Sequence, residues 1–70
     1  MAQGKIKTWI SDRGFGFIQP DGGGNDVFVH VKEFEKVGLS EPEVGERVSF
    51  DIETNIKNGK LAAVNLKALP

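Results

Sequence analysis

The chain has 70 residues, with nine Lys and Arg against ten Asp and Glu, one His and no Cys. This length indicates one domain, and the lack of Cys excludes disulfides and thiolate metal sites. A net charge of −1 argues mildly against a protein that holds nucleic acid mainly by neutralising phosphates. No apolar run approaches the ~20 residues of a membrane span, and residues 1–5 do not resemble an export signal. We therefore expect a cytoplasmic protein with no metal or other cofactor.

Turn signals divide the chain into short segments in which apolar and polar residues alternate, the pattern of β-strands. A turn at residues 12–14 separates the first two predicted strands, 4–11 and 15–19. The second strand ends at a flexible Gly-rich loop, 20–25, and a third strand, 26–31, is almost entirely β-branched or aromatic. Alternation in the first strand places Ile6, Thr8 and Ile10 on one face and Lys5, Lys7 and Trp9 on the other.

The second half of the chain begins with a change of composition, because Glu, Lys, Pro and Gly dominate residues 32–46. We expect a short helical turn at 32–36 and then an exposed loop. Strands at 47–56 and 61–69 follow, and the residues between them carry the Asn-Gly signal of a hairpin. Five short antiparallel strands would expose their edges in an open sheet, whereas closure removes those edges. The predicted fold is therefore all-β, a five-stranded antiparallel barrel of the oligonucleotide-binding (OB) type.

Aromatic residues gather on one face of the two central strands. The three valines of the third strand share one side and form the better core set, so Phe28 and His30 should point outward. An exposed aromatic patch suits base stacking, which contributes about 1–3 kcal/mol per base. Alternation alone leaves open the reverse arrangement of the second strand, with its phenylalanines in the core and Ile18 exposed. If the first three strands are neighbours, the patch comprises Lys7, Trp9, Phe15, Phe17, Phe28 and His30.

Two motifs resemble those of the cold-shock domain family. Residues 13–18, Arg-Gly-Phe-Gly-Phe-Ile, are similar to its first ribonucleoprotein motif, and residues 26–30, Asp-Val-Phe-Val-His, to its second. The resemblance runs from residue 4 to 64. It implies one cold-shock-like OB-fold domain over residues 1–70, with its core at 4–66, which binds single-stranded RNA or DNA as an RNA chaperone or regulator. It implies stacking on Phe15, Phe17, Phe28 and His30, with Lys7 and Arg13 at phosphates or base edges; alternation adds Trp9.

Three positions depart from the family pattern. Thr8 stands where the family has Trp, Val31 where it has Phe, and Leu39 where it has a further loop aromatic. The neighbouring Trp9 would compensate for one of these losses. If each missing ring removes about 1–3 kcal/mol, two losses weaken binding at least tenfold.

Two other functions compete with single-strand binding by a monomer. An adaptor barrel could use the aromatic face to bind a protein segment, and the acidic balance favours this slightly. An enzyme such as a nuclease is the weaker alternative, because the sequence has no clustered carboxylates and no Ser-His or Cys-His arrangement; we expect no catalysis. The domain could also be the amino-terminal, nucleic-acid-binding part of a longer protein.

Overall fold

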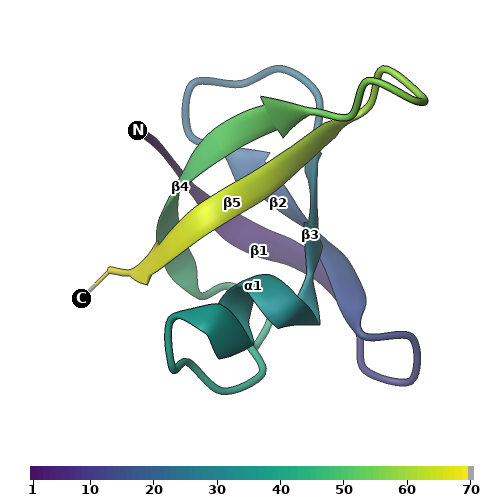
Figure 1. Cartoon of the computed structure of the whole chain (residues 1–70). Coiled ribbons are helices and arrows are strands. Elements are labelled where there is room, and N and C mark those ends of the chain that lie inside the picture. The colour runs from purple at the N-terminus through teal and green to yellow at the C-terminus, as the bar shows by residue number, and fades with distance from the viewer. Residues whose placement is uncertain (70) are drawn as a thin grey trace.

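A computed structural model describes residues 1–69 of the chain (Figure 1). These residues form β1 (Ala2–Ile10), β2 (Phe15–Pro20), β3 (Val27–His30), α1 (Val31–Lys36), β4 (Arg47–Thr54) and β5 (Leu61–Ala68). Every predicted strand is present, with ends displaced by two residues or fewer, and α1 lies at the predicted helical turn. Within the described residues, no helix is long and apolar enough to cross a membrane.

The strands close into a barrel in the order β1-β2-β3-β5-β4, which confirms the predicted OB-type architecture. Antiparallel pairs join β1 to β2, β2 to β3, β1 to β4 and β4 to β5. The pair that closes the barrel, β3 with β5, runs parallel and meets at Phe28 and Ala62. This parallel contact differs from the all-antiparallel expectation, and it brings the end of the β4–β5 hairpin beside the central strands.

The barrel interior is filled by the apolar side chains that alternation assigns to it. Ile18, Val27 and Val29 are each 1% exposed or less, so the core face of β2 and β3 is the predicted one. Helix α1 lies at one end of the barrel in Figure 1, and its Phe34 joins the interior. The buried cluster is completed by Ile6, Val48, Phe50, Ala63 and Leu66.

Strand β1 does not keep a period of two along its whole length. Ile6 lies opposite Ile18 and Thr8 lies opposite Phe17, the next residue along the ladder. Strand β1 therefore contains one extra residue, Lys7, that has no partner in β2. This β-bulge at Lys7 exchanges the two faces of the strand for the residues that follow it. The expectation that Trp9 shares a face with Lys5 and Lys7 is therefore wrong.

Candidate nucleic-acid interface

Three phenylalanine rings form a triangle on the outer surface of β2 and β3. Phe15 lies 5.4 Å from Phe28 and 6.2 Å from Phe17, and Phe17 lies 6.0 Å from Phe28, all between ring centroids. The uninterrupted pairing of the strands sets this spacing, because Phe17 faces Phe28 and Phe15 faces His30 across the ladder. We call these four residues the aromatic face. All four are half-buried, since their neighbours in sequence occupy the interior.

Gly16 lies between the two β2 phenylalanines and is itself buried against β1. A Cβ at this position would lie 2.2 Å from the Thr8 carbonyl oxygen and 2.6 Å from Trp9 Cε3. Glycine is therefore required by the close approach of β1 to β2. Because side chains alternate along a strand, Phe15 and Phe17 lie together on the outer side of β2.

Trp9 packs behind the aromatic face and contacts the core. Its ring meets the buried Phe34 edge-on, with 5.6 Å between centroids. The indole Nε1–H donates to Glu41 Oε1 at 2.7 Å, which attaches the loop after α1 to β1. Leu39, in the same loop, is partly buried against the core. Since the bulge at Lys7 turns Trp9 toward this side, the indole lies on the other side of β1 from Thr8.

Two β1 residues, Thr8 and Ile10, are paired with members of the aromatic face, Phe17 and Phe15. Thr8 is the more exposed of the two. It is exposed and pairs with Phe17, so its side chain lies on the outer side of the barrel. Alternation alone assigned Thr8 to the core side, and the bulge explains the difference. The alignment with the family, which has a tryptophan at this position, is the sequence signal that identifies Thr8 as a position beside the aromatic face.

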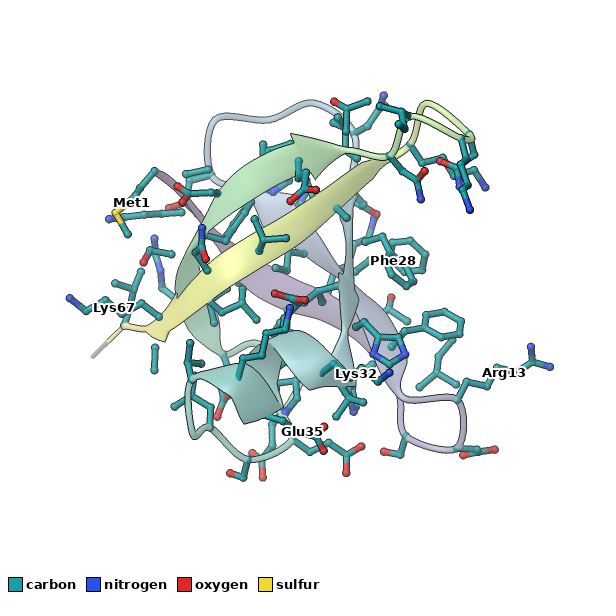
Figure 2. The ribbon with its side chains drawn as sticks, in the orientation of Figure 1. Met1, Arg13, Phe28, Lys32, Glu35 and Lys67 are labelled. Carbon is teal, nitrogen blue, oxygen red and sulfur yellow. The ribbon has the colours of Figure 1, made fainter. Side chains whose placement is uncertain are left out.

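The cations expected at the interface sit in two different environments. Lys7 Nζ forms an ion pair with Asp26 Oδ2 at 3.2 Å, at the base of the loop before β3. Arg13 is exposed in the β1–β2 turn, and Figure 2 shows its side chain extending into solvent on the side of the barrel that carries Phe28. Lys7 is therefore held by a carboxylate, whereas Arg13 forms no ion pair among the described residues.

An open hollow of about 790 Å³ adjoins the aromatic face. Its floor includes Phe17 and Phe28, and its far wall is the β4–β5 hairpin, which the parallel β3–β5 pair holds in place. The hairpin residues were absent from the predicted site, because nothing in the sequence reveals a parallel closure. The other residues that line the hollow are Asn25, Asp26, Asn55, Asn58, Gly59, Lys60, Leu61 and Ala62.

Comparison with known proteins identifies the family of the chain. The sequence model of the 'Cold-shock' DNA-binding domain matches residues 2–69. The chain belongs to the cold-shock domain family. Similar relatives are "Probable cold shock protein y4cH" of Sinorhizobium fredii and cold shock protein CspA of Rhizobium meliloti, each 46% identical over 68 residues, 97% of this chain and 99% of the relative. A cold shock protein of Arthrobacter globiformis is 39% identical over 66 residues, 94% of this chain and 98% of its own length.

Membership of the cold-shock domain family implies nucleic-acid binding, and for this family the nucleic acid is single-stranded. The chain keeps both motifs that carried the resemblance, and the structure brings them together as β2 and β3 of one barrel. Three phenylalanine rings of these motifs are half-exposed, although a small protein usually buries such rings.

Proposed function

We propose that this cold-shock domain binds single-stranded RNA or DNA by stacking bases on the aromatic face and acts as an RNA chaperone or cold-shock-type regulator in the cytoplasm. Bases stacked on the protein are unavailable for pairing, so the nucleic acid stays single-stranded without any catalysed reaction. The observation that carries the proposal is the triangle of phenylalanine rings, with 5.4 to 6.2 Å between centroids. Aromatic faces accept any base, because every base has a π-face.

Lys7 and Arg13 flank the aromatic face and supply the cationic contacts of the proposal. They would contact the phosphates of a strand that lies across β2 and β3. Trp9 is left out of the stacking set, because its ring is packed on Phe34 and its N–H is occupied by Glu41. We also propose that the protein works as a monomer, since the five strands of the described residues close into a barrel with one another rather than with a second copy.

The test compares two phenylalanines on opposite sides of the barrel wall. Phe28→Ala should leave the protein folded and weaken binding of oligo-dT by about 5- to 150-fold, the loss of one stacked base. Phe50 is 0% exposed and serves as the matched control. Phe50→Ala should lower the free energy of unfolding by about 3–5 kcal/mol. Thermal unfolding and a titration at low salt give both values for each variant.

Two outcomes would overturn the proposal. Phe28→Ala could unfold as readily as Phe50→Ala, in which case Phe28 is a core residue. Alternatively, the wild-type protein could fail to bind oligo-dT and oligo-U at low salt. The second result would favour the adaptor alternative, in which the aromatic face receives a protein segment.

A further inference from the structure

His30 lies where the aromatic face meets helix α1. It is the last residue of β3 and the N-cap of α1, with an extended backbone at φ −98° and ψ 149°. The Lys32 backbone N–H donates to its Nδ1 at 3.1 Å. On its other side, His30 pairs with Phe15 across the β2–β3 ladder. One imidazole therefore serves both the helix start and the proposed ligand surface.

The capping bond fixes which ring nitrogen of His30 carries the proton. A backbone amide can only donate, so Nδ1 must accept with a free lone pair. A neutral imidazole has one N–H, which is then on Nε2. Nε2 has no hydrogen-bond partner among the described residues. It is not enclosed either, because among those residues Ser49 Oγ is the one buried side-chain polar atom without a partner.

We propose that His30 is a specificity-determining residue of the aromatic face, because its Nδ1 caps α1 and its Nε2–H is the hydrogen-bond donor that the face offers to a ligand. The inference rests on the proposed single-strand binding. Phe15, Phe17 and Phe28 stack but have no polar atom, so they cannot distinguish one base edge from another. A fixed Nε2–H selects an acceptor oxygen, either a base carbonyl or a phosphate oxygen. The opposite tautomer would instead select donors such as exocyclic amino groups.

The first test examines the free protein at about pH 8, above the range in which histidine takes up a proton. Nitrogen-15 spectra of the labelled imidazole should show an unprotonated Nδ1 and a protonated Nε2. A protonated Nδ1 would overturn the proposal. This measurement needs no nucleic acid, so it fails or succeeds independently of the proposed function.

Two substitutions separate the cap from the ring. His30→Asn keeps a side-chain acceptor at the N-cap and removes the ring, whereas His30→Phe keeps a stacking ring and removes the acceptor. Hydrogen exchange of the Lys32 amide should be about fivefold faster in His30→Phe and unchanged in His30→Asn. Equal protection of the Lys32 amide in wild type and His30→Phe would show that His30 does not cap α1, and the proposal would fail.

The second test adds oligo-dT to the labelled wild-type protein. The Nε2–H signal should shift and exchange more slowly with water, while Nδ1 stays unprotonated. Repeating the titration with an oligo-dT whose methylphosphonate linkages keep one phosphoryl oxygen but carry no charge identifies the acceptor: the shift is unchanged for a base carbonyl and becomes smaller for a phosphate oxygen, which is a weaker acceptor without its charge. If Nε2–H is unmoved at saturation while Phe28→Ala still weakens binding, the proposed function stands and this inference fails. If oligo-dT does not bind at all, both fail.

Discussion

Strands β1 and β2 are neighbours in the barrel, yet their aromatic side chains point to opposite sides of the barrel wall. The β2–β3 ladder runs without interruption from Phe15 opposite His30 to Ile18 opposite Val27, and its rings all face outward. The β1–β2 ladder shifts its register between Ile6 and Thr8, and the aromatic residue after the shift packs inward on Phe34. Alternation along a strand therefore identifies a face only as far as the pairing is continuous.

The two strands therefore have different roles in the proposed site. The unbroken ladder provides the rings on which bases would stack. The bulged strand provides a support behind them, in which Trp9 joins β1 to α1 and to the loop that holds Glu41. An aromatic residue on a neighbouring strand can therefore be assigned to the site only when the register of that strand is known.

The largest effect is expected where the two strands touch. Gly16→Ala should lower the free energy of unfolding by at least ~3 kcal/mol, because the new Cβ would lie 2.2 Å from the Thr8 carbonyl oxygen. Gly22→Ala is the matched control, since nothing lies within 4 Å of its Cβ position. It should change stability by less than about 0.5 kcal/mol. Urea denaturation of both variants checks the pair. A Gly16→Ala variant as stable as wild type would show that β1 does not approach β2 in the bulged register.

Much of this fold could be predicted because its signals are local. Val27 and Val29 alternate with Phe28 and His30, and this pattern alone sets the inner and outer sides of β3. The bulge could not be predicted, because Lys7 carries no backbone signal such as Gly, and its extra residue is visible only against β2. The hollow beside Phe28 depends on a parallel pairing with β5, a contact between distant segments. Local alternation has no information on either.

The second prediction restores a ring on the outer side of β1. Thr8→Trp should strengthen binding of oligo-dT by about 5- to 150-fold, because an indole beside Phe17 offers one more stacking surface. Thr8→Ala, which adds no ring, is the control and should bind as wild type does. Fluorescence anisotropy of a labelled oligonucleotide measures both affinities. An unchanged affinity in Thr8→Trp would mean that the bound oligonucleotide does not contact residue 8.

The third prediction concerns the inward aromatic residue of β1. Glu41→Ala removes the acceptor of the Trp9 Nε1–H and should cost about 0.5–1.5 kcal/mol of stability. Trp9 emission should move to longer wavelength in this variant, and in wild type it should change little when oligo-dT saturates the protein. Glu43→Ala, an exposed acidic residue of the same loop, is the control and should alter neither. Strong quenching of wild-type Trp9 by oligo-dT would place the indole in the site after all.

The smallest effect is expected from the charges beside the aromatic face. We expect Lys7 and Arg13 to meet phosphates, and we count Lys5 and Lys60 as further candidates, so two to four contacts at ~0.7 each predict a log–log salt slope of about −1.4 to −2.8. The Lys7–Asp26 pair is partly exposed, at 53% and 33% of its side chains, and pairs of this kind contribute only about 0–1 kcal/mol.

Asp26→Asn should therefore raise the affinity for oligo-dT at low salt by less than about fivefold and steepen the slope by up to ~0.7, because Lys7 becomes free for one phosphate. Glu33→Gln, which frees Lys36 on α1, is the control and should leave the slope unchanged. Titrations over a series of salt concentrations measure all three proteins. A wild-type slope steeper than about −4 would require a basic surface outside the aromatic face, and binding would then depend on the whole barrel rather than on the continuous β2–β3 ladder.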